Sequence, residues 1–105
     1  MALATELTQT ELEALFAQLA EQWHDETGMH SVMHRIVGHP AYLRIIGLGP
    51  RAIPLIIGEL KTRGGWWFVA LEALTGEDPT DPADAQDYNA LAESWLAWAE
   101  RHGAL

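Results

Sequence analysis

The chain has 105 residues, of which 49% are hydrophobic and 20% charged, and it contains no cysteine. One hydrophobic core serves about 100 to 200 residues, so we expect a single domain over residues 1–105, frayed over residues 1–7. The lack of cysteine excludes disulfides and thiolate metal sites, and no segment has the pattern of a membrane span or a signal peptide, which predicts a cytoplasmic protein.

The charges follow an acidic, basic, acidic order along the chain. Fifteen acidic residues against six basic ones give a formal net charge of -9, which opposes nonspecific binding to nucleic acid or to an anionic bilayer. Five of the six basic residues lie between residues 30 and 65: Arg35, Arg44, Arg51, Lys61 and Arg63. They either pair with acidic outer helices inside the fold or form a basic patch for an acidic partner.

The first half of the chain predicts two helices. Thr8 and Glu11 have the spacing of a capping box, and apolar residues then recur at helical steps, which indicates a helix over residues 9–27. Residues 30–38 are open between a helical and an extended conformation. Pro40 is preorganised for a first helical position, so a short helix is expected over residues 40–47.

The second half predicts three more helices, over residues 51–62, 66–75 and from 82 or 86 to 102, separated by glycine-rich or acidic turns. No segment alternates apolar and polar residues for long enough to indicate a strand. The predicted fold class is all-α, a compact single domain of four or five helices in bundle-like or orthogonal packing. The expected core contains Leu15, Phe16, Leu19, Ile46, Ile53, Ile56, Leu71, Leu74, Leu91 and Trp95.

Two resemblances accompany this pattern. The stretch from Leu48 to Leu60, with the run Ala70-Leu71-Glu72-Ala73-Leu74-Thr75-Gly76, resembles one HEAT-like helical hairpin. A solenoid needs about three stacked repeats, so a repeat fold is not expected. Residues 39–98 resemble a group of small uncharacterised bacterial and phage-like proteins, on the segments His39-Pro40-Ala41-Tyr42, Ile45-Ile46-Gly47-Leu48-Gly49, Ala52-Ile53-Pro54-Leu55-Ile56, Trp67-Phe68, Ala70-Leu71, Thr75-Gly76 and Trp95-Leu96-Ala97-Trp98. This resemblance implies a helical fold and no particular activity.

Signals for chemistry are weak. His30 and His34 would share a helix face, with Glu26 one turn earlier and His39 nearby, which makes a conceivable set of two histidines and one carboxylate for a metal. The set lacks the His-Glu-x-x-His form, and the chain has no nucleophile elbow, dinucleotide fingerprint or phosphate loop. We therefore expect no tight metal site, no cofactor and no catalytic residue.

Tryptophan is the unusual feature of the composition, with five residues in 105. Trp66 and Trp67 are adjacent, so on a helix they would point about 100° apart, and Trp98 lies at the margin of the stripe that contains Trp95. Tryptophan is a frequent anchor at protein interfaces, which predicts a partner-binding surface around Arg63, Trp66 and Trp98. The alternative is that the large rings only fill the core.

Together these features predict a noncatalytic module that binds another protein. A small acidic regulator or a subunit of a larger bacterial complex suits the charge; it could be inhibitor-like or antitoxin-like, or imitate nucleic acid. One alternative is a metal-dependent enzyme or metal protein that uses Glu26, His30, His34 and His39. Another is an accessory nucleic-acid binder that uses the central basic patch, against the net charge of -9. The partner and the oligomeric state are open at this point.

Overall fold

A computed structural model describes residues 7–28 and 33–104, and within them the chain is helical with no strand. Six α-helices are joined by turns that include the 3-10 segments η2 (Pro50–Ala52) and η3 (Pro82–Asp84). The helices are α1 (Gln9–Thr27), α2 (Met33–Val37), α3 (Pro40–Gly47), α4 (Ile53–Thr62), α5 (Phe68–Thr75) and α6 (Tyr88–Arg101). The all-α single domain is confirmed, with one more helix than expected because part of the undecided segment, Met33–Val37, is helical.

Helix α1 begins and ends where the sequence predicted. The Thr8 hydroxyl accepts a hydrogen bond from the Glu11 amide at 3.1 Å, and the Glu11 carboxylate accepts one from the Thr8 amide at 2.9 Å. This capping box satisfies two amides that a helix start leaves unpaired. One face of α1 is buried and packs mainly against α3. Near the end of α1, the Trp23 indole donates to the carbonyl of Ile36 at 2.7 Å and so holds α2.

Prolines set the starts of α3 and α4. His39 caps α3, its Nδ1 accepting from the amide of Ala41 at 3.0 Å, and Pro40 occupies the first turn. The helix then continues to Gly47, as predicted. The 3-10 turn η2 leads into α4, and Pro54 lies in the first turn of α4, where a missing amide breaks no hydrogen bond.

Helix α5 begins at Phe68, so its predicted start at Trp66 is wrong. Gly64 and Gly65 adopt positive φ angles of 75° and 116°, which a helix does not allow. The amide of Gly65 donates to the Tyr88 hydroxyl at 3.0 Å, and the chain then turns at Trp66, where the Trp67 amide donates to the Gly65 carbonyl at 3.0 Å. Helix α6 begins at Tyr88 and is capped by Asp87, while Pro82–Asp84 forms only the turn η3.

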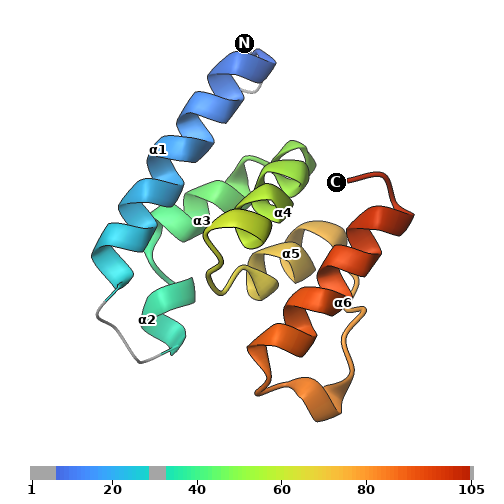
Figure 1. The fold of residues 1–105 in the computed structure, drawn as a ribbon. Helices are drawn as coiled ribbons and strands as arrows, with labels where there is room; N and C mark the ends of the chain where they lie inside the picture. Colours follow the sequence, from blue (N-terminus) through green and yellow to red (C-terminus); the bar gives the residue numbers. More distant parts are fainter. Residues whose placement is uncertain (1–6, 29–32, 105) are drawn as a thin grey trace.

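The buried residues form one core that spans all the longer helices. In Figure 1, α1 and α6 lie on opposite sides of the molecule, with α3, α4 and α5 between them. Trp67 is fully buried in the core, stacked on Tyr42 at 5.6 Å and 8° and packed against Trp23 at 4.4 Å between ring centroids. Six of the ten predicted core residues are buried: Phe16, Leu19, Ile56, Leu71, Leu91 and Trp95. The other four are partly buried against the same cluster: Leu15, Ile46, Ile53 and Leu74.

The HEAT-like hairpin is not confirmed, because α5 packs more extensively on α3 than on α4, and α4 packs mainly on α6. Among the described residues, no single helix has the length and apolar composition to cross a membrane. The pair Pro40–Gly47 and Pro50–Thr62 reaches that composition only together, and it is bent by 108°.

Candidate functional site

Trp66 lies in the non-helical link between α4 and α5, with its side chain half-buried. Its ring packs edge-on against Phe68, with centroids 4.9 Å apart, and lies 6.2 Å from the ring of Tyr88. Its backbone carbonyl accepts a hydrogen bond from the hydroxyl of Tyr42 at 2.9 Å. Packing on one side and a backbone anchor on the other therefore fix Trp66 at the surface.

The anchor works because Tyr42 is buried and neutral. Burial raises the pKa of Tyr42 well above its usual value, an effect that outweighs the lowering by backbone hydrogen bonds from Ala70 and Val69. A neutral phenol can donate and accept at once. Its hydroxyl donates to the backbone carbonyl of Trp66 and accepts from the amide of Ala70 at 3.0 Å. One side chain therefore connects the link to the first turn of α5.

A groove of about 270 Å³ opens beside Trp66, between α5, the loop that follows it, and α6. Apolar side chains and three carboxylates line it: Trp66, Phe68, Val69, Glu72, Asp78, Thr80, Asp81, Pro82, Ala85, Leu91 and Trp95. Val69 is 42% exposed and offers apolar surface at this groove. Small-molecule pockets typically occupy about 300–1,000 Å³, so this volume suits one or two side chains of a partner.

The three carboxylates are held differently. Asp78 accepts from the amide and the hydroxyl of Thr80, and Asp81 accepts from the amide of Ala83 at 2.9 Å, so both are oriented by local turns. Glu72 projects from α5, is exposed, and its side chain makes no hydrogen bond within the described part of the chain. The groove thus has two fixed acidic groups and one that can adjust.

The segment that supplies the groove is acidic. Residues 64–100 contain eight acids and no Lys, Arg or His: Glu72, Glu77, Asp78, Asp81, Asp84, Asp87, Glu93 and Glu100. Over residues 7–28 and 33–104, the one ion pair between side chains with permanent charge joins Arg63 to Glu21, and two histidines meet carboxylates, His24 with Glu59 and His39 with Glu26. None of these pairs involves Glu72, Asp78 or Asp81, so the carboxylates that line the groove have no ion-pair partner among the described residues.

The structure separates the three residues predicted to bind a partner. Arg63 is exposed and pairs with Glu21 of α1 at 2.9 Å. Trp98 is only 6% exposed, so its predicted outward orientation is wrong. Its ring stacks on His102 at 4.3 Å between centroids, and its indole donates to Glu77 from the loop before α6 at 3.2 Å. Trp98 does not line the groove, and of the three residues only Trp66 does.

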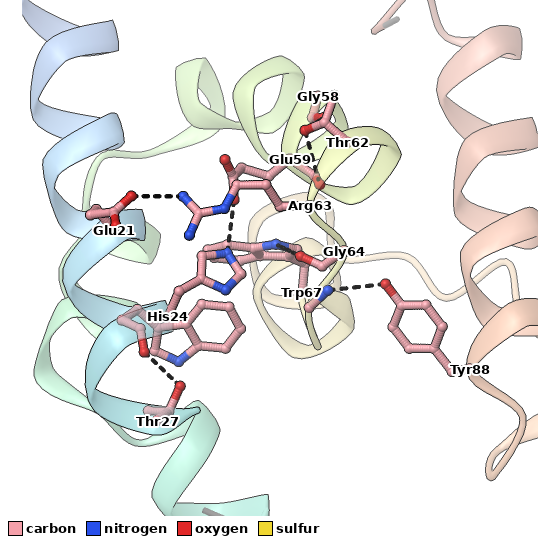
Figure 2. A network of polar contacts seen from close by, with 12 residues as sticks. Glu21, His24, Thr27, Gly58, Glu59, Thr62, Arg63, Gly64, Trp67 and Tyr88 are labelled. Carbon is pink, nitrogen blue, oxygen red and sulfur yellow. Dashed lines mark hydrogen bonds and ion pairs between the residues drawn. The ribbon is translucent and has the colours of Figure 1, made fainter. Parts of the chain in front are cut away.

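A polar network between α1 and α4 was missed by the sequence analysis (Figure 2). His24 Nε2 lies 2.9 Å from Glu59 Oε1, with 20% and 16% of the two side chains exposed, and the Arg63–Glu21 pair lies beside it. His24 and Glu59 are 35 positions apart, so no local pattern indicates that they meet. The network joins α1 to α4, and within it the Glu59 carboxylate is hydrogen-bonded to the His24 ring.

Of the metal candidates, the structure brings Glu26 and His39 together but not His34. Within residues 7–28 and 33–104, no group of three or more His, Cys, Asp or Glu side chains could hold a metal ion. His39 Nδ1 accepts from a backbone amide, so Nε2 carries the proton and donates to Glu26 Oε1 at 2.8 Å. A metal would have to displace one of these bonds. His34 is exposed on α2, and His30 lies outside the described residues.

The five residues of the predicted basic patch are distributed over α2, α3, η2 and the end of α4. Arg51 donates to the carbonyl of Leu7, just before α1, at 2.7 Å, and Arg63 binds Glu21 of α1. Two of the five basic side chains are therefore bound to the N-terminal part of the chain. Arg35 and Arg44 are exposed. Lys61 lines a second, more open hollow of about 320 Å³ between α4 and α6, with Glu93, Leu96, Ala97 and Glu100.

No protein-family model matches the chain, and no curated protein or solved structure is significantly similar to it. The resemblance to small bacterial and phage-like proteins stays a prediction.

Proposed function

We propose that this protein is a noncatalytic module that binds another protein through the groove beside Trp66. The observation that carries the proposal is the combination of a half-buried tryptophan, the exposed Val69 and three carboxylates around one hollow. Interface anchors are typically aromatic side chains at the edge of a pocket, surrounded by polar groups. A small acidic regulator, or an acidic subunit of a larger complex, is the kind of protein that such a surface suits.

The charge supports a protein partner over nucleic acid. A phosphate backbone would meet the acids of residues 64–100, and in the basic middle two arginines are occupied by α1. An inhibitor that imitates nucleic acid fits the same distribution, because it would present its acids to a basic site.

The test begins by identifying what touches the groove. A photo-crosslinking amino acid placed at Val69 is expected to capture a partner in host cells, and the same group at Leu43 is the matched control. Leu43 is a 54% exposed apolar residue on α3 that does not line the groove. A partner captured equally from both positions, or only from Leu43, would contradict the proposal.

Binding of the captured partner is then measured with purified proteins. Trp66→Ala is expected to weaken association by about 30-fold or more, since anchor truncations typically cost 2 kcal/mol and every 1.4 kcal/mol is tenfold. Leu43→Ala should bind like the unchanged protein. Val69→Ser provides a second groove variant at an exposed position, in case Trp66→Ala lowers the melting temperature. Unchanged affinity in both groove variants would refute the assignment of this surface.

A further inference from the structure

We propose that the occupant of the groove is a partner segment that carries an arginine, with its guanidinium against the ring of Trp66 and the carboxylates of Glu72 and Asp81. This inference rests on the proposed function, because it names the chemistry of the partner that the groove binds. Three separate properties of the groove lead to it: its charge, its aromatic wall and its size.

The carboxylates of the groove could be neutralised by a cation from a partner. Glu72, Asp78 and Asp81 line one hollow, and residues 64–100 supply no basic side chain to neutralise them. The ion pairs within the described residues all lie earlier in the chain and on other elements. On the α1 side, by contrast, Glu21 pairs with Arg63, and Glu26 and Glu59 are hydrogen-bonded to histidine rings. A cationic group in the hollow would have two oriented carboxylates and the adjustable Glu72 as partners.

The aromatic wall selects among cations. Trp66 is half-buried and is held by its packing on Phe68, so its ring is already fixed before any partner arrives. Trp is the side chain that attracts cations most strongly to its face. A planar guanidinium can stack on such a ring while its N–H groups pair with carboxylates, whereas an ammonium offers only a point charge. Arginine therefore uses both parts of the groove, and lysine uses mainly the acids.

The size limits how much of the partner enters. A hollow of about 270 Å³ accepts one long side chain and part of a neighbour, and Val69 at its edge offers apolar contact to that neighbour. We therefore infer a segment with an arginine beside an aliphatic residue. A second copy of this chain is the competing occupant, since Arg35 and Arg44 are exposed near the exposed Leu43.

The test uses three short peptides with blocked ends, each with two leucines around one central residue. That residue is arginine, lysine or citrulline, the last having the shape of arginine without its charge. Each peptide is titrated into the isotope-labelled full chain and followed by NMR. We expect the arginine peptide to shift the Trp66 indole and the amides of Val69 and Glu72 first. The citrulline peptide should bind about tenfold more weakly or worse, and lysine should fall between them.

The matched variants are Glu72→Gln with Asp81→Asn, and Glu100→Gln as the control. Asn can keep the turn that Asp81 caps, and Glu100 is an exposed acid of α6 outside the groove. The double variant should lose about tenfold in arginine-peptide affinity, and the control should keep it. Equal binding of arginine and citrulline, shifts spread over the acidic faces of α1 and α6, or an unaffected double variant would each overturn the inference.

The remaining outcomes separate this inference from the proposed function. If a natural partner needs Trp66 but tolerates Glu72→Gln with Asp81→Asn, the groove is the binding surface and the arginine assignment is wrong. If the partner needs none of the three, both are wrong. If the protein alone shows groove shifts that grow with its concentration and vanish in Arg44→Gln, the occupant is a second copy and the inference is overturned.

Discussion

The ring of Tyr42 lies parallel to that of Trp67, with centroids 5.6 Å apart and an angle of 8° between the planes, and its hydroxyl accepts a hydrogen bond from the backbone of α5 at Ala70. One residue of α3 thus contributes to the centre of the core and also fixes the entry to α5. The groove depends on this contact, because the same hydroxyl binds the carbonyl of Trp66.

Removing the Tyr42 hydroxyl should lower the stability of the protein without leaving a large cavity in the core. Tyr42→Phe keeps the ring but leaves the buried amide of Ala70 without its acceptor, which should lower the free energy of unfolding by about 1–3 kcal/mol. Denaturant unfolding followed by circular dichroism measures the change. A neutral result would mean that water or another group replaces the phenol oxygen.

Alkaline pH should lower the stability of the fold through the same side chain, Tyr42. The pKa of Tyr42 is raised by burial in the folded state, whereas an unfolded tyrosine loses its proton near pH 10. Stability from this group is therefore fully present below about pH 10 and is lost as pH rises further. Melting temperatures measured from pH 8 to 11 should fall at the alkaline end more steeply for the unchanged protein than for Tyr42→Phe. Parallel curves would contradict the prediction.

Two glycines should respond in opposite ways to replacement by alanine. Gly65 has a φ of 116°, and an added Cβ would lie 3.0 Å from a ring carbon of Trp23, so Gly65→Ala should destabilise by at least about 1–2 kcal/mol. Gly58 is exposed inside α4, and an added Cβ there would meet nothing within 4 Å. Gly58→Ala should therefore stabilise by about 0.5–1 kcal/mol. The midpoints of urea unfolding compare the two variants directly, and a shift in the same direction for both would refute this reading of the α4–α5 link.

Leu71 provides a test of the core itself. Its side chain is 0% exposed, so Leu71→Ala should cost about 2–5 kcal/mol, which is a large fall in melting temperature for a domain of this size. The control is Leu43→Ala, at a position 54% exposed, where a change within about 0.5 kcal/mol is expected. Similar melting temperatures for the two variants would place Leu71 outside the core.

Zinc should not stabilise the protein. A specific ligand raises stability by mass action, and the ring of His39 already binds both a backbone amide and Glu26. We expect the melting temperature to stay unchanged at equimolar zinc. A saturable increase that disappears in a His30→Ala, His34→Ala double variant would instead support the alternative of a metal protein.

Local signals were sufficient for most helix boundaries. The capping box at Thr8 and Glu11 set the start of α1, and Pro40 set that of α3, because in both cases neighbouring residues satisfy or remove the first amides. The start of α5 was predicted two residues early, since Trp66 and Trp67 continue an apolar pattern. The side-chain hydrogen bonds that hold this non-helical link come from Tyr42 and Tyr88, on helices distant in sequence.

The candidate site was predicted in part, by Trp66 alone. Its exposure follows from a local argument, that two adjacent tryptophans cannot both enter one stripe. Trp98 was assigned to the surface by a different argument, its position at the margin of the stripe that contains Trp95. That argument failed because His102, one turn later, stacks on its ring and Glu77 accepts a hydrogen bond from its indole. The groove itself joins residues from position 66 to position 95, so no single helical pattern contains it.

Most acidic residues belong to α1 and to the α5–α6 part of the chain, whereas most basic residues belong to the segment between them. Residues 1–63 carry seven acids and five Lys or Arg residues, and residues 64–105 carry eight acids and one Arg, so most of the net charge of -9 belongs to the second part. Because α1 and α6 lie on opposite sides of the molecule, a cationic surface would attract either of its acidic ends before any contact forms. Its rate of association, more than the lifetime of the complex, would then change with ionic strength.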